Sequence, residues 1–549
     1  MAPRSGIRER SVNPSKPVTT PQTLRVIEFL ANPKSYAHVP NEVRLVETHA
    51  SWVFLASPYA FKIKKPVNLG FLDFTTLDLR RADCERELEL NRRLAGEIYL
   101  GVVPVCDSGG KLHLGGEGEV LEWVVKMREM DPKCFLSRLI SAERPSLTDM
   151  ERLISRLHEF YRDQRPLPAE ASSEAARRTR QSVHDNFVML RPFLDSEISA
   201  RSLAAIERYA VTFEGRHVRL FSSRVDNGWF RDCHGDLHLE HIHLTLERVD
   251  IYDCIEFNNA FRFIDVSSDL AFLAMDLDFN CRPDLARHVV ERFATLLHDK
   301  GLRILNDYYK CYRACVRAKV ECLRSTSETL SEEEKRYSFG RARRYVQLAL
   351  RYAIAGTSPR MIVCMGRVAS GKSTLAGALG AELGWPVISS DLVRKDLAGV
   401  PVNYRGAADE RARLYSADMT ARTYETLVAR GVEALQEGQG IILDATFSQR
   451  SHRDALRKQI RQGKFPCIWI EATASETTSL DRLRQRENAP GASDARAEDF
   501  VDLSRSYEPP KECMEGTIIR VCTNGHLDAS VRTMLLALAE AQACAGCDD

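Results

Sequence analysis

Long apolar runs are missing from this sequence of 549 residues, since no stretch approaches the ~20 apolar residues that a membrane span requires. A secretory apolar segment is also missing near the start, where residues 1–21 are rich in Pro, Ser and Arg and are predicted to form a flexible tail. The 77 Lys and Arg residues balance 76 Asp and Glu residues, to a net charge of +1. This balance argues against a dominant nucleic-acid or membrane field.

Internal repeats and long low-complexity tracts are absent too. The 15 cysteines come without a secretory segment, so we expect reduced thiols in a cytoplasmic protein. The composition that remains, 44% hydrophobic and 28% charged residues, is ordinary for a soluble globular chain. The length predicts about three domain-sized units. No membrane partner is expected, and nothing in the sequence determines the oligomeric state.

A phosphate-binding motif follows the apolar run 361–365. Residues 366–374 have the sequence GRVASGKST, which fits GxxxxGK[ST] and predicts a P-loop between a strand and a helix. Glycines let the backbone amides turn toward the phosphates, a lysine supplies charge, and a serine can bind Mg²⁺. The motif therefore predicts ATP and Mg²⁺ as cofactors. The predicted binding residues are Gly366, Ala369, Ser370, Gly371, Lys372, Ser373 and Thr374.

A second buried strand is predicted at residues 440–447 (GIILDATF), with Asp444 in the position of a carboxylate that holds Mg²⁺ through water. A motor-type ATPase usually has Glu directly after that Asp, whereas Ala445 and Thr446 follow here. Phosphoryl transfer is therefore favoured over hydrolysis. The base-reading motif NKxD is absent, which disfavours a GTPase switch.

Between these strands, residues 387–397 (VISSDLVRKDL) combine a short apolar strand with a polar turn. Asp391 lies where a carboxylate can accept a proton from a substrate hydroxyl, and Arg394 can hold the acceptor or a phosphate. The alternative is that Asp391 only caps a helix. Both residues are predicted to be catalytic, together with Lys372.

Farther along, residues 477–487 (TTSLDRLRQRE) are predicted to be helical. Arg482 and Arg486 are four apart and share a face, as expected for arginines that close over a transferring phosphoryl group. Residues 488–495 (NAPGASDA) have the Pro and Gly content of a hinge. The alternative is an ordinary solvated helix face.

These motifs occur in the order found in small P-loop kinases of the polynucleotide kinase, gluconate kinase and zeta-toxin group, of the AAA_33 type, which residues 360–549 resemble. The resemblance implies an α/β fold, a doubly wound parallel sheet with a helical lid. It implies transfer of a phosphoryl group from ATP to a hydroxyl acceptor.

The front of the chain contains a different signature at residues 232–244 (DCHGDLHLEHIHL). It resembles the catalytic loop HGDxxxxN of aminoglycoside phosphotransferase-like kinases, which implies that Asp236 is a catalytic base and that His234 braces the loop. The family places a Mg²⁺-binding Asn where this chain has His241. Imidazole suits a hard cation less well than an amide oxygen does. The histidines of this loop could alternatively suggest zinc.

The same resemblance implies a metal carboxylate downstream, where this chain has Ile255, Glu256 and Phe257. Glu256 takes that place, with Asp253 as the alternative because the register of the hairpin is open. His241 and Glu256 are the predicted metal ligands of the front site.

Upstream, the runs 43–47, 52–56 and 60–67 predict a three-strand meander. Its third strand contains AFK, similar to the AxK of kinases, so Lys62 is expected at the nucleotide phosphates, paired with Glu87 from the helical run 83–94. Glu85 and Glu89 compete for that role. As single residues, lysines at a strand edge are usually solvated.

The whole chain resembles bifunctional proteins in which an aminoglycoside phosphotransferase-like domain precedes a P-loop kinase. The expected architecture is α/β and α+β: a protein-kinase-like domain over 22–340, a linker over 341–359 and the P-loop domain over 360–549. The expected activity is an ATP-dependent phosphotransferase with an alcohol acceptor, most simply a small molecule. Two alternatives stay open: a front pseudokinase that senses a ligand and regulates the P-loop half, and a polynucleotide 5′-hydroxyl kinase.

Overall fold

The structure is a computed structural model that describes residues 20–48, 50–68, 70, 72–142, 145–195, 198–327, 330–356, 360–402, 404, 412–437, 439–487, 496–511 and 518–544. The chain forms two compact units. The first unit comprises Met1–Ser182 with Arg219–Asn306, and the second comprises Val183–Val218 with Asp307–Asp549. Of the predicted tail, residues 1–19 lie outside the described residues, and Pro21 already belongs to helix α1 (Pro21–Ala31).

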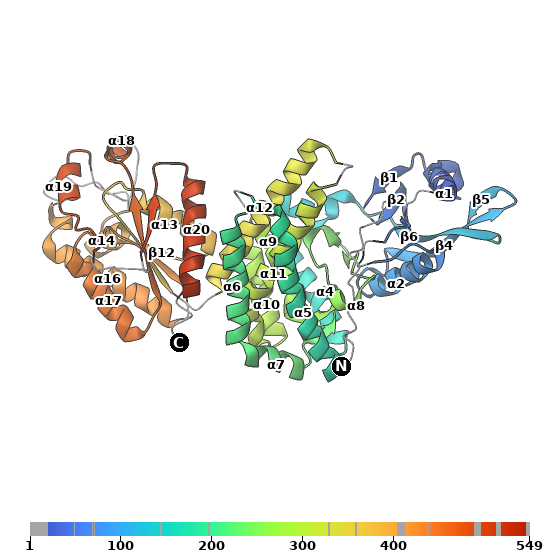
Figure 1. Ribbon diagram of the computed structural model, residues 1–549, viewed down its shortest axis with the longest axis horizontal. Coiled ribbons are helices and arrows are strands. Elements are labelled where there is room, and N and C mark those ends of the chain that lie inside the picture. The colour runs from blue at the N-terminus through green and yellow to red at the C-terminus, as the bar shows by residue number, and fades with distance from the viewer. Residues whose placement is uncertain are drawn as a thin grey trace, which may run out of the picture. The chain divides into compact units, whose positions relative to one another are not determined.

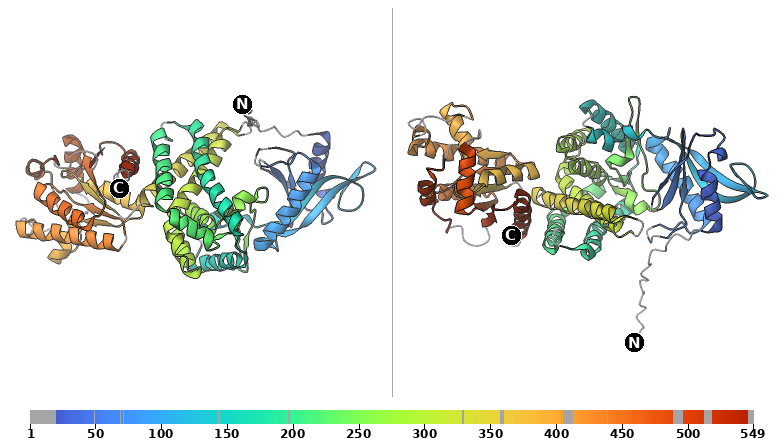
Figure 2. Two further views of the ribbon diagram at one scale, coloured as in Figure 1. Left: turned by 60° about the horizontal axis from the view of Figure 1, so that its bottom comes forward. Right: turned by 90° about the horizontal axis from the view of Figure 1, so that it is seen from above.

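The first unit begins with an antiparallel sheet of six strands, drawn in blue in Figures 1 and 2. The order is β1-β2-β3-β6-β4-β5. The predicted meander is confirmed, because β2 pairs with both β1 and β3. The strands are β1 (Arg44–Glu47), β2 (Ser51–Ala56), β3 (Tyr59–Lys64), β4 (Tyr99–Ser108), β5 (Lys111–Leu114) and β6 (Glu119–Arg128).

Side chains of β3 point alternately to the two faces of the sheet, and each face packs into a different small apolar core. Phe61 and Ile63 pack with Val26 and Leu30 of α1, whereas Ala60 packs with Cys84 of α2 (Leu77–Ala95). Because side chains alternate between the faces of a strand, Lys62 and Lys64 face α2 with Ala60.

The helical part of the first unit surrounds an apolar core that includes Leu153, Leu157, Leu273 and Phe293. Two small antiparallel ladders, β7 with β10 and β8 with β9, frame the segment that carries the predicted catalytic loop. Its helices and strands are α3 (Leu136–Ser141), α4 (Leu147–Asp163), α7 (Val218–Asp226), β7 (Phe230–Asp232), β8 (Ile242–Leu244), β9 (Val249–Ile251), α8 (Asn259–Arg262), β10 (Phe263–Asp265), α9 (Val266–Phe279) and α10 (Pro283–Leu296). The helices α5 (Ala169–Leu190) and α11 (Lys300–Ser325) cross from one unit to the other along the chain.

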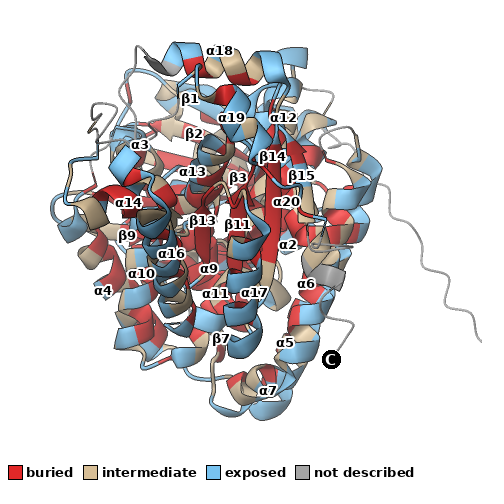
Figure 3. Ribbon diagram, turned by 90° about the vertical axis from the view of Figure 1, so that its left-hand side faces the viewer, coloured by how far each residue is buried: buried red, intermediate tan, exposed pale blue. Residues whose placement is uncertain are grey.

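The second unit contains a five-stranded sheet in the order β12-β13-β11-β14-β15, and all of its pairs are parallel. This confirms the parallel sheet predicted for the back of the chain. Its strands are β11 (Met361–Met365), β12 (Val387–Ser389), β13 (Ile441–Asp444), β14 (Cys467–Thr473) and β15 (Ile518–Cys522). Its inner strands β11, β13 and β14 are largely buried, as Figure 3 shows, because helices cover both faces of the sheet, whereas the edge strands β12 and β15 are partly exposed.

Helix α13 (Lys372–Leu383) approaches the face that presents Ile442, whereas α16 (Ala417–Gln436) approaches the face that presents Leu443. Neighbouring residues of one strand point to opposite faces, so the two helices lie on opposite sides of the sheet (Figure 1). The remaining helices of the unit are α6 (Ala200–Arg216), α12 (Glu332–Ala355), α14 (Ser390–Ala398), α17 (Arg450–Gly463), α18 (Glu476–Glu487), α19 (Phe500–Arg505) and α20 (Leu527–Cys544).

The segment 341–359, which we expected to be a linker, differs from that expectation. Helix α12 begins with a capping box at Ser331 and continues through Ala355, with Tyr345 and Ala349 buried, and it packs on α6, α13 and α20. Residues 357–359 lie outside the described residues. The compact units therefore divide the chain differently from the predicted boundary at residue 340, because an apolar helix face requires a partner surface.

None of the helices in the described parts of the chain has the length and apolar character needed to cross a membrane. The cysteines that the structure describes form no disulfide with one another.

Candidate functional site

The loop between β11 and α13 has the conformation that its glycines permit. Gly366 has a φ of 149° and Gly371 a φ of 85°, both in the region that favours glycine. A Cβ atom on Gly366 would lie 2.4 Å from the carbonyl oxygen of Ala472, and one on Gly371 would lie 3.0 Å from Oγ1 of Thr523. A larger residue would therefore clash with backbone at Gly366 and with the side chains of Thr523 and Arg482 at Gly371, and its backbone conformation would be strained at both positions.

Helix α13 begins at Lys372, directly after this loop. Ser373 and Thr374 are exposed in its first turn, and Lys372 is half-buried. Backbone N–H groups in the first turn of a helix have no partner within the helix and attract anions. The predicted phosphate-binding residues thus lie together at the start of one helix.

The register of the sheet brings the predicted acidic residues to the same edge. Cys364 of β11 and Ser389 of β12 both pair with Asp444 of β13. The P-loop follows β11, and Asp391 follows β12 in the first turn of α14. Parallel strands end at the same edge, so P-loop, Asp444 and Asp391 converge there, as is usual for ligand sites of such sheets.

Asp444 is buried, with 4% of its surface exposed, and its Oδ1 atom has no hydrogen-bond partner among the described residues. A buried carboxylate oxygen without a partner is unfavourable. Burial raises the pKa of Cys364 well above the ordinary thiol value, and the negative charge of Asp444 raises it further. Asp391 is half-exposed and therefore accessible to a solute.

Arg394 lies on the same helix as Asp391 but is buried, with 6% of its surface exposed. Its Nη1 atom donates to the carbonyl oxygen of Leu414 at 2.9 Å and to Oγ1 of Thr420 at 3.2 Å, and its guanidinium lies 4.6 Å from the ring centre of Tyr415. The structure therefore places Arg394 as a connection between α14 and the start of α16, with its Nε atom buried and without a partner among the described residues.

The first of the two predicted lid arginines contacts the P-loop directly. Arg482 donates through Nη1 to the carbonyl oxygen of Ala369 at 3.3 Å and through Nη2 to that of Thr523 at 2.6 Å. Thr523 in turn donates through Oγ1 to the carbonyl oxygen of Ser370 at 2.6 Å. The side chain of Arg486 and the predicted hinge 488–495 lie outside the described residues.

Thr523 was missed by the sequence reasoning, although its place directly after the last parallel strand, β15, was an available signal. A second missed group lies beyond Asp444. Tyr424 and Thr446 share a hydroxyl–hydroxyl bond of 3.2 Å, and the ring of His452 stacks on Tyr424 at 4.1 Å. Burial and the positive charges of Arg394 and Arg453 lower the pKa of His452, so the imidazole of His452 is neutral near pH 7.

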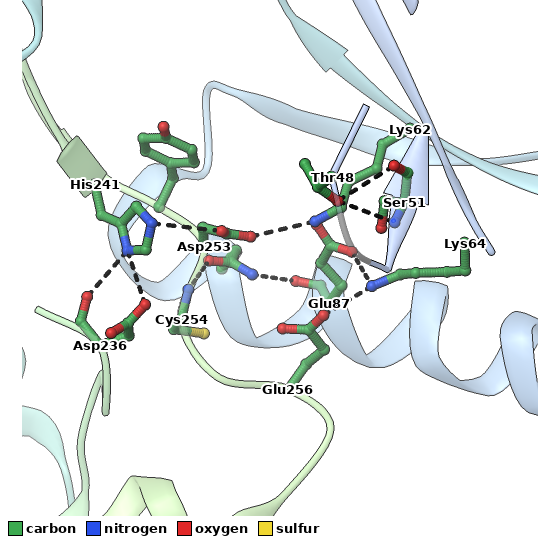
Figure 4. Close-up of polar contacts among 12 residues, drawn as sticks. Thr48, Ser51, Lys62, Lys64, Glu87, Asp236, His241, Asp253, Cys254 and Glu256 are labelled. Atoms are coloured by element: carbon green, nitrogen blue, oxygen red, sulfur yellow. Dashed lines mark hydrogen bonds and ion pairs between the residues drawn. The ribbon is translucent and has the colours of Figure 1, made fainter. Parts of the chain in front are cut away.

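The front site contains the predicted lysine–glutamate pair (Figure 4). Nζ of Lys62 on β3 lies 2.8 Å from Oε1 of Glu87 on α2, and Glu87 is fully buried. Glu85 and Glu89 are exposed, and Glu85 pairs with Arg81 on the surface. Among the three glutamates, the structure brings only Glu87 to Lys62.

Lys64 has a role that the sequence reasoning missed, since lysines at a strand edge were expected to be solvated. Its side chain is 1% exposed, and its Nζ atom lies 2.7 Å from Asp83, 2.6 Å from Glu87 and 2.7 Å from Glu256. The available signal was the spacing, because residues two apart on a strand share a face.

Glu256, a predicted metal ligand, lies at this lysine rather than at the catalytic loop. The carboxylates of Asp83, Glu87 and Glu256 are close enough to surround a metal ion, but the ammonium of Lys64 occupies the position between them. Burial raises the pKa of Glu256 to about 7, against the opposing effect of Lys64.

The alternative ligand, Asp253, lies in the site instead. One of its oxygens is 3.2 Å from Nζ of Lys62, and the other is 3.5 Å from Nε2 of His241. Lys62 holds the pKa of Asp253 well below its usual range, despite the opposing effect of burial. The hairpin register that the sequence left open therefore favours Asp253 over Glu256.

Asp236, the predicted base, is about one-third exposed, at 32%, and its carboxylate lies 3.5 Å from both His238 and His241. Asp269 holds the loop in place, because its carboxylate accepts from the backbone N–H groups of His234 and Gly235 at 3.0 and 2.9 Å. Burial lowers the pKa of His234 to about 3, so this ring stays neutral and braces the loop through the carbonyl oxygen of Tyr252.

Comparison with known proteins adds two findings. Residues 361–510 match the family described as an AAA domain, and these residues include the P-loop, Asp391 and Asp444. Over 458 residues the chain is 33% identical to an uncharacterized protein of Mycobacterium tuberculosis (strain H37Rv), covering 82% of this chain and 87% of that protein. An uncharacterized protein of Mycobacterium bovis shows the same values.

Among solved structures, the gluconokinase of Sinorhizobium meliloti 1021 is 20% identical, with 35% of this chain and 98% of that chain covered and a TM-score of 0.26. The APS kinase of Mycobacterium tuberculosis, solved with AMPPNP and APS, is 17% identical, with 33% of this chain and 98% of that chain covered and a TM-score of 0.26.

Proposed function

Because the chain belongs to the family of these mycobacterial proteins and its residues 361–510 form a P-loop domain, we propose that it is an ATP-dependent phosphotransferase with a hydroxyl acceptor. One observation supports this proposal above others. The sheet register aligns the ends of β11, β13 and β12, so that the P-loop, Asp444 and Asp391 share one edge. A phosphate grip, a metal carboxylate and a candidate base are the components that phosphoryl transfer to an alcohol needs.

In this proposal the P-loop amides and Lys372 bind the phosphates of ATP. Ser373 and Asp444 would hold Mg²⁺, which neutralises phosphate charge when it is bound. The residues fit the ion, because the hydroxyl of Ser373 is exposed at the helix start and Asp444 keeps a buried oxygen without a partner among the described residues. Arg482 lies beside the P-loop, where a cation stabilises negative charge on a transferring group.

Asp391 is the proposed base. It accepts the proton of the acceptor hydroxyl as the bond from that oxygen to the γ-phosphorus forms and the bond to ADP breaks. Asp391 is half-exposed at the sheet edge, whereas Asp444 is buried, so the accessible carboxylate is assigned the proton and the buried one the metal.

Transfer is favoured over hydrolysis because no carboxylate follows Asp444. Ala445 is buried, and the hydroxyl of Thr446 is bonded to Tyr424. Neither side chain can take a proton from water. We propose a small-molecule alcohol as the acceptor, since the chain has a net charge of +1 and therefore no strong overall positive field that would attract nucleic acid.

For the front unit we propose a second, kinase-like nucleotide site. Lys62 lies between the carboxylates of Glu87 and Asp253, and Asp236 lies on the far side of His241. This order supports phosphate binding by Lys62 and proton acceptance by Asp236. A front unit that binds nucleotide without transferring phosphate would instead be a ligand sensor for the other unit.

The test uses the full chain with γ-³²P-labelled ATP and pools of metabolites and oligonucleotides. We expect Asp391→Asn to reduce transfer by about 10²–10⁴-fold while ATP affinity changes little. Asp396→Asn is the matched control, because Asp396 is on the same helix but exposed and paired with Arg430. Transfer by Asp391→Asn at the parent rate would refute the assignment, and labelling confined to oligonucleotide ends would replace the small-molecule acceptor.

The front site is tested separately in the same assay. A second labelled product that Asp236→Asn abolishes, and that Asp391→Asn leaves unchanged, would establish transfer by the front unit. Calorimetric binding of Mg·ATP that depends on Lys62, without any such product, would establish the sensor instead.

A further inference from the structure

We propose that the front unit binds a divalent transition-metal ion between Nε2 of His241 and the carboxylate of Asp253, and that the imidazole makes this site prefer such an ion to Mg²⁺. Binding of the ion requires no phosphoryl transfer by either unit. His241 comes from the turn before β8, and Asp253 from the segment after β9, so the hairpin of these two strands brings both to one place (Figure 4).

The hydrogen bonds of His241 decide which ring nitrogen faces the site. Nδ1 lies 3.0 Å from the backbone carbonyl oxygen of Asp236. A carbonyl oxygen only accepts, so Nδ1 carries the hydrogen and Nε2 presents its lone pair. A histidine with Nδ1–H bonded to a carbonyl and Nε2 exposed to the ligand is the usual arrangement of a metal-binding imidazole.

The lone pair of Nε2 faces Oδ2 of Asp253 at 3.5 Å. Two acceptors that face each other repel, and the distance exceeds the 2.7–3.2 Å of an ordinary N–H···O hydrogen bond. A cation that binds both atoms removes this conflict. The other oxygen of Asp253 is bonded to Lys62 at 3.2 Å, which orients the carboxylate and leaves Oδ2 toward His241.

The neighbouring trio of Asp236, His238 and His241 also has metal-like spacing, but its hydrogens point the wrong way. Nδ1 of His238 accepts from the backbone N–H of Glu240, so the hydrogen of this ring is on Nε2, the atom that lies 3.5 Å from Asp236. Nδ1 of His241 also carries a hydrogen on this side. Both rings thus direct N–H groups toward Asp236, and the lone pair available for a metal lies on the side of Asp253.

Asp253 is held rigidly for this role. Its φ of 58° is in the left-handed region, which Asp tolerates better than most residues. The backbone N–H of Tyr252 donates to the carbonyl oxygen of His241 at 3.0 Å, and that of Cys254 donates to Oδ1 of Asn91 at 2.9 Å. Asn91 in turn donates to the carbonyl oxygen of Glu87 at 3.0 Å. Both flanks of Asp253 are therefore fixed, which favours a preformed site.

The surrounding charge favours a cation. The ammonium groups of Lys62 and Lys64 face four carboxylates, those of Asp83, Glu87, Asp253 and Glu256. The carboxylates outnumber the ammonium groups, and nearby Asp236 adds to the excess. Asp253 is 40% exposed, so an ion there keeps positions open for water or for a phosphate.

The donor set selects the type of ion. Mg²⁺ prefers oxygen ligands in a strict octahedron, whereas imidazole suits ions such as Zn²⁺, Fe²⁺ and Co²⁺, and affinity for mixed nitrogen and oxygen sites rises along the first transition row from Mn²⁺. Mn²⁺ is the appropriate probe, because it accepts both donor types and its unpaired electrons report a bound nitrogen.

The experiment uses the full chain with Lys372→Ala as the common background, which removes phosphate binding by the P-loop. Mn²⁺ is titrated and followed by electron paramagnetic resonance, with pulsed measurement of the coupling to ¹⁴N. We expect bound Mn²⁺ with an imidazole ¹⁴N coupling. His241→Asn should abolish that coupling. Because an amide oxygen suits Mg²⁺ better than imidazole does, Mg²⁺ should displace Mn²⁺ from this variant about tenfold or more readily than from the parent, which corresponds to about 1.4 kcal/mol. The proposed metal residues of the back unit, Ser373 and Asp444, include no imidazole, so their signal is distinguishable.

His113→Asn is the matched control, because His113 lies on β5 and bonds to the carbonyl oxygen of Glu117, away from these residues. It should keep both the coupling and the affinity. Asp253→Asn should weaken Mn²⁺ while the circular dichroism spectrum stays that of the parent. The proposal is overturned if the ¹⁴N coupling is absent from the parent or persists in His241→Asn, or if Mg²⁺ displaces Mn²⁺ as readily from the parent as from His241→Asn.

Discussion

Replacing Lys64 by Met tests whether the buried charge cluster of the front unit stabilises that unit. Methionine keeps most of the length of the side chain but removes the ammonium that contacts Asp83, Glu87 and Glu256. Glu87 retains Lys62 at 2.8 Å, whereas within the described part of the chain Asp83 and Glu256 form ion pairs only with Lys64. The substitution therefore leaves carboxylates buried without their cation.

Breaking a buried ion pair by removing one partner destabilises a protein by about 3–5 kcal/mol. The adjacent Lys65 provides the control, because it is also buried but its partner Glu47 is 60% exposed, so that the carboxylate that loses its cation stays in water. Loss of a pair whose carboxylate is exposed costs about 0–1 kcal/mol, and loss of the cation–π contact to Trp52 costs about 0.5–1 kcal/mol more. We expect the destabilisation by Lys64→Met to exceed that by Lys65→Met by at least about 1 kcal/mol at pH 8.

Hydrogen exchange of the full chain, read by mass spectrometry in peptides that cover β3 and α2, measures this local free energy of opening. At pH 8 Glu256 is above its pKa of about 7, so its charge is present in the folded parent. Lowering the pH should narrow the difference between the two variants, since protonation relieves an unpaired carboxylate. Equal protection of the β3 and α2 amides in Lys64→Met and Lys65→Met would refute this account of the cluster.

Two further predictions concern one residue of each unit. Gly366→Ala should abolish nucleotide binding measured by calorimetry, because its Cβ atom would lie 2.4 Å from a backbone carbonyl oxygen. Gly377→Ala is the control and should leave binding intact, because a Cβ atom at this position of α13 meets nothing within 4 Å. Tight nucleotide binding by Gly366→Ala would contradict the P-loop geometry. Glu256→Gln should flatten the dependence of the free energy of unfolding on pH between 4.5 and about 7. Burial raises the pKa of Glu256 in the folded state, so in this window the folded parent binds a proton that the unfolded chain does not. The stability of the parent therefore falls by up to about 3 kcal/mol as the pH rises through the window. Urea unfolding across that range measures the slope, and an unchanged slope in the variant would show that another group causes it.

The back unit was largely predictable because its signals are local. An apolar run before GxxxxGK[ST] predicts a strand, a tight glycine turn and a helix start, and the structure has β11, this turn and α13 in that order. The strand with Asp444 and the parallel sheet were predicted from similar short patterns. In the front unit the meander was also predicted from short strand and turn patterns. The candidates for the partner of Lys62 were predicted from the spacing of glutamates along one helix, and the phase of that helix had to come from the structure.

Other features depended on groups far apart in the sequence. Lys62 and Asp253 are 191 residues apart, and Lys64 and Glu256 are 192 apart, so no local pattern could assign each carboxylate to its lysine. The sequence likewise indicated only a basic helix that ends near a glycine at the place of α12. That its apolar face is buried depends on the helices that cover it.

The sequence by itself determined where phosphate groups can bind and which residue types surround them, because tight turns and strand ends follow from neighbouring residues. Only the tertiary structure decided that Asp253 rather than Glu256 faces His241, and that Lys64 neutralises a buried cluster. The physical reason is that a charge in a protein interior is stabilised by whichever opposite charge the fold brings within about 3–4 Å, and the packing of helices and sheets determines that choice.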